Sequence, residues 1–161
     1  MSSPRIRRAR PEEYDRIAEL TVAAYLADRP VGAYESELRR VADRAEQGTV
    51  LAALDAGENL IGTVTVLLER GPWTELAGDG DAEIRMLAVD PAVRGAGVGT
   101  TLTLAVLELA RAGGAKRMVL STQSTAQPAH RIYDQLGFTR RADLDWSPRP
   151  GVNLLGYTLD L

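Results

Sequence analysis

Residues 94–100 have the types and the spacing needed to bind a phosphate group. Arg94 is followed by Gly95, Gly97 and Gly99, so three glycines stand at alternate positions beside a cation. Glycine lets the backbone approach a ligand closely and adopts positive φ without strain. The first amides of a helix point at an anion placed before it, and arginine can add a charge-assisted hydrogen bond. The segment is therefore predicted to bind a pyrophosphate.

Two other phosphate-binding loops lack a required residue here. The dinucleotide fingerprint, counted from Gly95 and Gly97, needs a glycine where Thr100 stands. The Walker loop needs Gly-Lys before its Ser or Thr, and no such lysine is present. A different nucleotide-binding protein is kept as a further hypothesis, and it predicts binding of ATP or NAD.

The elements around the loop are predicted from hydrophobic periodicity. Residues 81–89 read as a strand that closes at Asp90-Pro91, and residues 97–112 carry one apolar helical stripe that ends at Gly113-Gly114. The loop therefore joins the end of a strand to the start of a helix. The other predicted strands are 4–10, 49–54, 60–69, 116–122, 138–141 and 152–161, and the other predicted helices are 11–25, 34–45 and 128–136. This order predicts a mixed α/β fold with a helical crossover between two parallel strands.

Composition limits the classes of function. The 161 residues fit one domain, predicted over residues 1–161, and the net charge of −3 argues against a nucleic-acid partner. No cysteine is present, which excludes disulfides, thiolate metal ligands and a cysteine nucleophile, and a single histidine excludes a His-rich metal site. No metal site is predicted.

Membrane and export signals are also missing from the sequence. No apolar run approaches the ~20 residues that cross a bilayer. Four arginines fall within residues 1–10, but no apolar segment follows them as it would in a signal peptide. We expect a cytoplasmic protein without a membrane partner.

Three segments in order resemble the GNAT superfamily of acetyl-coenzyme A-dependent N-acetyltransferases. Arg94-x-x-Gly97-x-Gly99 resembles its acetyl-coenzyme A signature, residues 82–91 are similar to its fourth strand, and residues 129–138 are similar to its Ala-x-x-x-Tyr-x-x-x-Gly-Phe segment. The block from 81 to 138 carries the resemblance, and the element order outside it agrees. The chain is identified as a member of this superfamily.

The resemblance implies a central mixed sheet of about seven strands, flanked by about four helices and splayed between strands 4 and 5. The pantetheine arm of acetyl-coenzyme A would lie in that gap, bonded by backbone groups of Leu87 and Val89, and the amides of residues 94–100 would bind the pyrophosphate. The implied cofactor-binding residues are Leu87, Ala88, Val89, Arg94, Gly95, Ala96, Gly97, Val98, Gly99 and Thr100.

The activity implied is transfer of acetyl directly to a primary amine through a ternary complex, because a covalent cysteine intermediate is impossible. Such a reaction needs a base, a donor for the oxyanion and an acid for the leaving thiolate. Glu83 is the candidate base by its place on the fourth strand, although it could equally be a solvent-facing strand residue. Tyr133 falls on the motif's tyrosine and is the candidate acid, and the N–H of Leu87 is the candidate oxyanion donor. The glutamates that stay open as alternative bases are Glu35, Glu37 and Glu75.

Several points stay open at this level. Ala126 stands where many relatives have a cofactor-binding asparagine, and Ser121, Ser124 or Gln127 could replace that contact. His130 is interpreted as a helix-surface residue. The acceptor is a small-molecule or peptide amine, and a homodimer is possible. The alternative function is a non-catalytic module that binds or senses acyl-coenzyme A.

Overall fold

Seven strands form a single mixed sheet in this computed structural model, which describes residues 3–161. The strands are β1 (Arg5–Arg8), β2 (Thr49–Leu54), β3 (Leu60–Leu67), β4 (Asp81–Val89), β5 (Arg117–Gln123), β6 (Thr139–Arg149) and β7 (Val152–Asp160). Their order across the sheet is β1-β2-β3-β4-β5-β7-β6. Neighbouring strands are antiparallel except for β4 and β5, which are parallel and joined through a helix. The predicted mixed α/β class and seven strands are confirmed.

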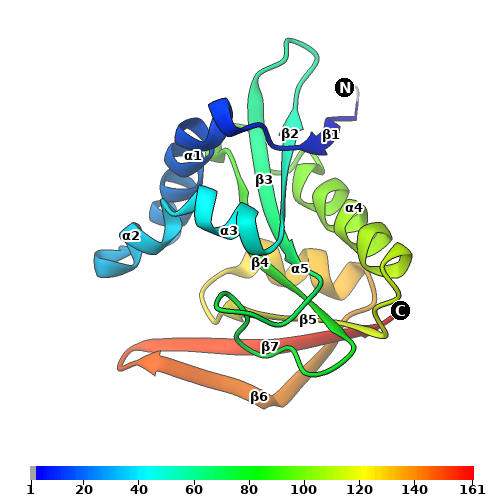
Figure 1. Cartoon of the computed structure of the whole chain (residues 1–161). Coiled ribbons are helices and arrows are strands. Elements are labelled where there is room, and N and C mark those ends of the chain that lie inside the picture. The colour runs from blue at the N-terminus through cyan, green and yellow to red at the C-terminus, as the bar shows by residue number, and fades with distance from the viewer. Residues whose placement is uncertain (1–2) are drawn as a thin grey trace.

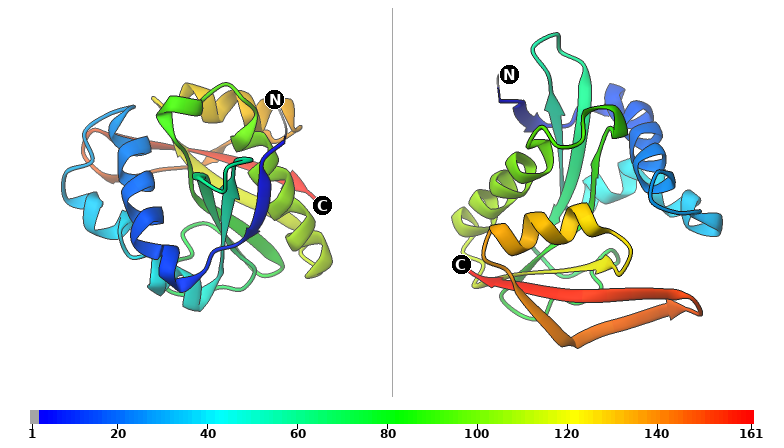
Figure 2. Two further views of the ribbon diagram at one scale, coloured as in Figure 1. Left: turned by 90° about the horizontal axis from the view of Figure 1, so that it is seen from above. Right: turned by 180° about the vertical axis from the view of Figure 1, so that it is seen from behind.

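Helices cover both faces of this sheet (Figures 1 and 2). They are α1 (Tyr14–Leu26), α2 (Glu35–Leu38), α3 (Val41–Gln47), α4 (Val98–Ala112) and α5 (Gln127–Gln135). The first three lie on one face, and α4 and α5 lie on the other (Figure 1). Val98 and Leu102 of α4 are buried against Gly62 of β3, where an added Cβ would lie 2.9 Å from each of their side chains. This close approach holds the first turns of α4, and therefore its N-terminus, against β3.

The sheet splits between β4 and β5. The two strands pair only where Asp81 to Glu83 meet Arg117 to Val119, and they diverge beyond that point. An ion pair of 2.9 Å between Asp81 and Arg117 closes the paired end. The splay predicted between strands 4 and 5 is therefore confirmed, and it leaves the second half of β4 with a free edge.

Two predicted segments differ in the structure. Residues 34–45 form two short helices instead of one, so the helices number five among the described residues instead of about four. The buried guanidinium of Arg44 donates to the carbonyls of Glu37 and Leu38, which satisfies the end of α2 and lets α3 start in a new direction. Strand β6 also continues to Arg149, through a stretch predicted as loop, because an edge strand tolerates Pro148 without losing a ladder bond.

The single domain over residues 1–161 includes Met1 and Ser2, which lie outside the described residues, and it stays a prediction. Within residues 3–161, no helix combines the length and apolar character needed to span a bilayer. The same part of the chain holds no group of three or more His, Asp or Glu side chains placed to bind a metal ion.

Candidate active site

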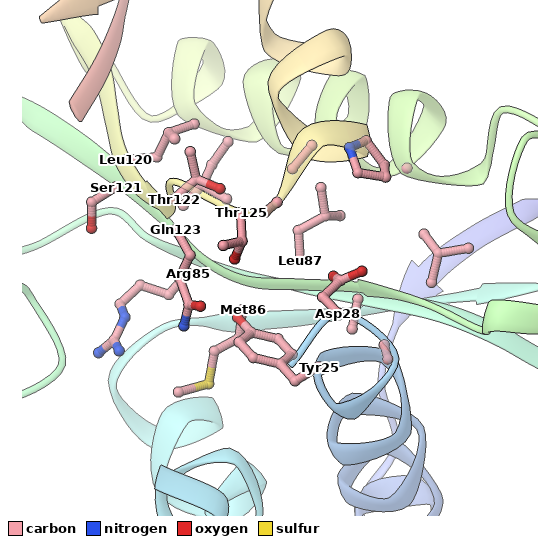
Figure 3. A pocket seen from close by; sticks show the side chains of 18 of the residues that line it. Tyr25, Asp28, Arg85, Met86, Leu87, Leu120, Ser121, Thr122, Gln123 and Thr125 are labelled. Atoms are coloured by element: carbon pink, nitrogen blue, oxygen red, sulfur yellow. The ribbon is translucent and has the colours of Figure 1, made fainter. Parts of the chain in front are cut away.

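A cleft of 990 Å³ opens where β4 and β5 separate (Figure 3). Its walls come from the second half of β4, from Leu120 to Gln123 of β5, and from α5. The loop after β4 and the start of α4 line it too, as do residues of α1, of α2, of the end of β6 and of the start of β7. Segments from most of the chain therefore meet at the free edge that the splay creates.

The glycine loop forms the wall beyond the end of β4. Gly95 and Gly97 have φ of 87° and 84°, a region that glycine enters without strain, and a Cβ at either position would meet no atom within 4 Å. Gly97 is the N-cap of α4, and having no side chain it leaves the first amides of the helix free for a ligand. The loop therefore has the geometry of an anion site at a helix N-terminus.

Nine of the ten predicted cofactor-binding residues line the cleft, and Ala96 does not. The side chain of Arg94 is turned toward α1, where it donates to Asp28 Oδ1 at 2.9 Å and to the carbonyl of Ala24 at 2.8 Å. Because the guanidinium of Arg94 is already hydrogen-bonded to α1 and Asp28, the groups of the loop that are available to a phosphate are its backbone amides. Arg94 also ties the glycine loop to the opposite wall of the cleft.

A bulge shapes the β4 wall. Thr63 pairs with Ala88 but Thr65 pairs with Arg85, so β4 has one extra residue between these pairs. Met86 takes up the irregularity with φ of 56°, an uncommon conformation for a residue other than glycine. Such strain persists where the surrounding structure imposes it, often beside functional sites. The bulge stops β4 from continuing regular pairing where Leu87 faces the cleft.

Tyr133 lies on the α5 wall, as predicted for a candidate acid. It lines the cleft, its side chain is buried, and its ring packs 5.4 Å from Phe138 and 5.8 Å from Tyr157. Burial, with a smaller effect from Tyr157, raises the pKa of its phenol above the usual value. The phenol therefore stays protonated at neutral pH and is able to donate a proton. Tyr133 therefore belongs to the hydrophobic core and also lines the cleft, and its role as the acid stays a prediction.

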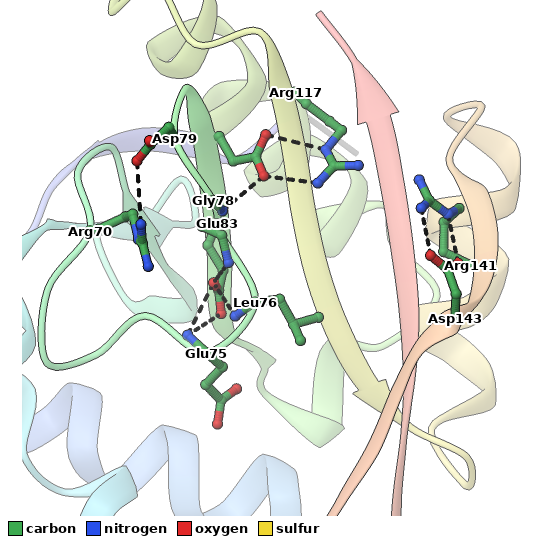
Figure 4. A network of polar contacts seen from close by, with 11 residues as sticks. Arg70, Glu75, Leu76, Gly78, Asp79, Glu83, Arg117, Arg141 and Asp143 are labelled. Carbon is green, nitrogen blue, oxygen red and sulfur yellow. Dashed lines mark hydrogen bonds and ion pairs between the residues drawn. The ribbon is translucent and has the colours of Figure 1, made fainter.

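Glu83 occupies a position that argues against its role as the base. Its side chain is fully buried and does not line the cleft. The carboxylate accepts hydrogen bonds from the amides of Glu75, Leu76 and Ala77, at 2.9 to 3.1 Å (Figure 4). Neither a surface role nor a direct catalytic role fits this geometry. Instead, Glu83 anchors the loop that follows β3 onto the sheet.

The anchored loop carries Glu75 to the cleft, where it is one of the carboxylates on the wall. Arg85 holds it from the side, with an N–O distance of 3.5 Å, and also donates to the hydroxyl of Tyr34 and the carbonyl of Trp73, both at 2.9 Å. Burial raises the pKa of Glu75 although Arg85 opposes the change. A carboxylate placed and tuned in this way suits a general base. Of the other glutamates left open, Glu37 lines the cleft and Glu35 does not.

Two residues of the site were missed or misread from the sequence. Gln123 of β5 lines the cleft, and its Oε1 is buried with no hydrogen-bond partner among the described residues. A buried acceptor of this kind is costly unless a donor meets it, and a ligand in the cleft would supply one. His130, interpreted as a surface residue, is buried and donates through Nε2 to the carbonyl of Gln123 at 2.9 Å. It thereby fixes the end of β5.

The structure also shows which side chains lie near Ala126, where many relatives have a cofactor-binding asparagine. Ala126 lines the cleft, so the position itself faces the ligand space. Ser121 lines it as well and accepts a bond of 3.4 Å from the indole of Trp146, whereas Ser124 and Gln127 stand outside the lining. Gln123, with its free acceptor, is the better replacement.

The cleft is basic although the protein is weakly acidic. Its lining includes five arginines and three acidic residues, against a net charge of −3 for the chain. These residues are Arg29, Arg85, Arg94, Arg131 and Arg149, with Asp28, Glu37 and Glu75. The excess of positive charge favours an anionic ligand.

Comparisons with known proteins agree with this geometry. The model of the acetyltransferase (GNAT) family matches residues 14–138. A mycothiol acetyltransferase from Actinosynnema mirum is 31% identical over 111 residues, which cover 68% of this chain and 35% of that protein. The chain thus spans about a third of the length of this relative.

Solved structures show the same fold at low identity. A GNAT-family acetyltransferase from Staphylococcus aureus Mu50 superposes with a TM-score of 0.78 at 17% identity, covering 99% of both chains. The structure of YncA from Salmonella typhimurium with its cofactor acetyl-CoA gives a TM-score of 0.73 at 23% identity, covering 99% of this chain and 95% of that chain.

Proposed function

Because the chain belongs to the acetyltransferase (GNAT) family, we propose that it transfers an acetyl group from acetyl-coenzyme A directly to a primary amine. The observation that carries this proposal is the cleft in the splayed sheet, which ends at a positive-φ glycine loop and the open N-terminus of α4. A long ligand with a phosphate group at one end fits that shape and its basic lining. The activities named for the relative and for the solved structures agree with it.

In this proposal the amides of residues 95–100 bind the pyrophosphate, and the backbone of Leu87 and Val89 binds the pantetheine arm along the free edge of β4. Acetyl-coenzyme A supplies a thioester that an amine can attack. Val89 lies at the end of β4 that leads into the loop, and Arg85 lies four residues back along β4. The bulge at Met86 shortens this part of the strand, so the two residues are at most about 13 Å apart. The acceptor therefore enters near Arg85, where Glu75 lies.

We assign the base to Glu75 and keep the acid at Tyr133. Glu75 takes the proton that the ammonium must lose, directly or through water, and the backbone N–H of Leu87 donates to the oxyanion. Tyr133 gives its proton to the leaving thiolate. The raised pKa of Glu75 makes it a better proton acceptor. The raised pKa of Tyr133 keeps its phenol protonated until the thiolate leaves.

The pH dependence tests Glu75. A base acts only when it is ionised, so kcat/KM should fall as the pH drops through the pKa of Glu75. Because burial raises this pKa above its ordinary value of 4.5, the fall should occur at a pH above 4.5. Glu75→Gln should remove this step and leave the dependence that comes from the acceptor's own ammonium. Glu35→Gln, whose residue is outside the cleft lining, serves as the control and should keep both steps. A Glu75→Gln profile identical to that of the unaltered protein would refute the assignment.

Binding separates this function from other nucleotide-binding functions. A thermal-shift titration with acetyl-coenzyme A, coenzyme A, ATP and NAD needs no knowledge of the acceptor. Ligand at a hundred times its dissociation constant should add ~2.7 kcal/mol of stability. The proposal predicts a shift with the two coenzyme A ligands alone. A shift with ATP or NAD and none with acetyl-coenzyme A would overturn it.

The partner and location also belong to the proposal. The acceptor is a small-molecule or peptide amine, the protein is cytoplasmic, and a homodimer is possible. The mycothiol acetyltransferase relative does not identify the acceptor, because the chain matches 35% of its length.

A further inference from the structure

The acceptor end of the cleft contains a cation that the proposed chemistry does not use. Arg149, at the end of β6, lines the cleft and is exposed. It forms no ion pair with any residue from 3 to 161. Its guanidinium carbon lies 6.0 Å from the ring centroid of Tyr34, so the side chain is held over an aromatic face. A placed but unpaired guanidinium in a cleft is suited to binding an oxyanion.

Arg85 differs from Arg149 because its charge is already matched. It is 8% exposed and contacts the Glu75 carboxylate. The same guanidinium donates to the hydroxyl of Tyr34. Arg85 therefore positions Glu75 and the tyrosine, and it is less available for a second anion.

Tyr34 brings opposite charges into one small region. Arg149 lies over its ring, and its hydroxyl is bonded to the arginine that holds Glu75. A substrate lying against Tyr34 would thus meet a free cation on one side and a carboxylate on the other. A compact zwitterion matches both charges, whereas a polyamine would bring a further ammonium toward Arg149.

We propose that the acceptor is an α-amino acid, with its carboxylate on Arg149 and its ammonium directed at Glu75. This inference rests on the proposed acetyl transfer and narrows its substrate class. Glu75 accepts the proton of the ammonium, and the freed nitrogen forms a bond to the acyl carbon. The carbon–sulfur bond then breaks, and the leaving thiolate takes a proton from Tyr133. The nitrogen loses its second proton as the amide forms, and this proton returns Tyr133 to its neutral form, directly or through water. The products are an N-acetylamino acid and coenzyme A.

The test compares each of the common L-amino acids with its own α-carboxamide, and adds spermidine as a cationic acceptor. The release of coenzyme A is measured for all of them. An arginine–carboxylate contact predicts that the best amino acid exceeds its amide in kcat/KM by about 10- to 100-fold. Arg149→Gln should abolish this preference, mainly by raising KM for the amino acids. Arg111→Gln, an exposed arginine on α4 outside the cleft, should keep the preference.

Each contrary outcome has a separate meaning. Amides or spermidine accepted as well as the amino acids would overturn the zwitterionic acceptor, and so would a preference that survives in Arg149→Gln. Acetyl-coenzyme A binding with no transfer to any of the panel would overturn it too. The absence of acetyl-coenzyme A binding would instead refute the proposed function itself.

Discussion

Glu83→Gln separates a catalytic role of this residue from an anchoring role. The substitution keeps the shape of the side chain and removes its charge. In the structure the carboxylate accepts the amides of Leu76 and Ala77 through Oε1, both at 2.9 Å, and the amide of Glu75 through both oxygens at 3.1 Å. A glutamine has one oxygen, so it can keep the three bonds to Oε1, but it loses the charge and the second bond from Glu75. Its NH₂ group is then a buried donor that faces the amide of Glu75.

The expected cost follows from these contacts. Hydrogen bonds to charged groups contribute about 1.5–3 kcal/mol net, and a buried donor left unsatisfied costs about 1–3 kcal/mol. Glu83→Gln should therefore lower the free energy of unfolding by about 2–3 kcal/mol. Glu108→Gln, an exposed position on α4, should change it by less than about 0.5 kcal/mol. Urea unfolding of the two variants beside the unaltered protein measures both values.

The same variant distinguishes the two roles through kcat/KM measured against pH. If Glu83 anchors the loop, its loss displaces Glu75 and lowers the rate, but the fall at acid pH that belongs to Glu75 remains. If Glu83 is the base, the fall at acid pH disappears while stability is nearly unchanged. The second result would refute the reasoning from the hydrogen bonds.

Three further substitutions test the cofactor loop, the acid and a distant ion pair. Gly97 and Gly114 both have positive φ, and a Cβ added at either position would meet no atom within 4 Å. Alanine at each position should therefore cost about 1 kcal/mol of stability through backbone strain alone, but only Gly97→Ala should weaken acetyl-coenzyme A binding in a titration. Tyr133→Phe should lower turnover by ~10²–10⁴-fold if protonation limits the rate, whereas Tyr157→Phe, outside the cleft lining, should not; equal rates in single-turnover experiments would end the assignment. Hydrogen bonds from Arg7 lower the pKa of Glu13 to about 2. The ion pair therefore stabilises the folded protein fully above about pH 4.5, and this contribution is lost as the pH falls toward 2. Glu13→Gln should therefore lower the unfolding free energy by about 1–2 kcal/mol at pH 7, with a difference that closes in acid, and a difference independent of pH would contradict this.

The sequence predicted the fold wherever local patterning decides the structure. Apolar and β-branched runs predicted β2, β3 and β4, and the apolar stripe of α4 placed the glycine loop between a strand and a helix. The division of residues 34–45 was not predictable, because it depends on Arg44 reaching the carbonyls of Glu37 and Leu38 after the chain has folded. Such a contact leaves no mark in hydrophobic periodicity.

The site was predicted unevenly for the same reason. The glycine spacing reflects a local backbone conformation, and the positive φ of Gly95 and Gly97 agrees with it. The choice among carboxylates depends on tertiary contacts instead. Glu83 and Glu75 were both candidates, and only the fold shows that the first bonds the amide of the second and that Arg85 holds the second at the cleft. Gln123 has an alternating position on β5 beside Ser121, a signal that could have been used.

The most direct test of the central claim is product analysis. The protein is incubated with acetyl-coenzyme A and a panel of primary amines, and each amine is examined by mass spectrometry while coenzyme A release is followed. The account predicts that at least one amine gains an acetyl group in step with coenzyme A release, and that Tyr133→Phe slows both. Acetyl-coenzyme A that binds while no amine is acetylated would contradict the account and favour a module that only binds or senses acyl-coenzyme A.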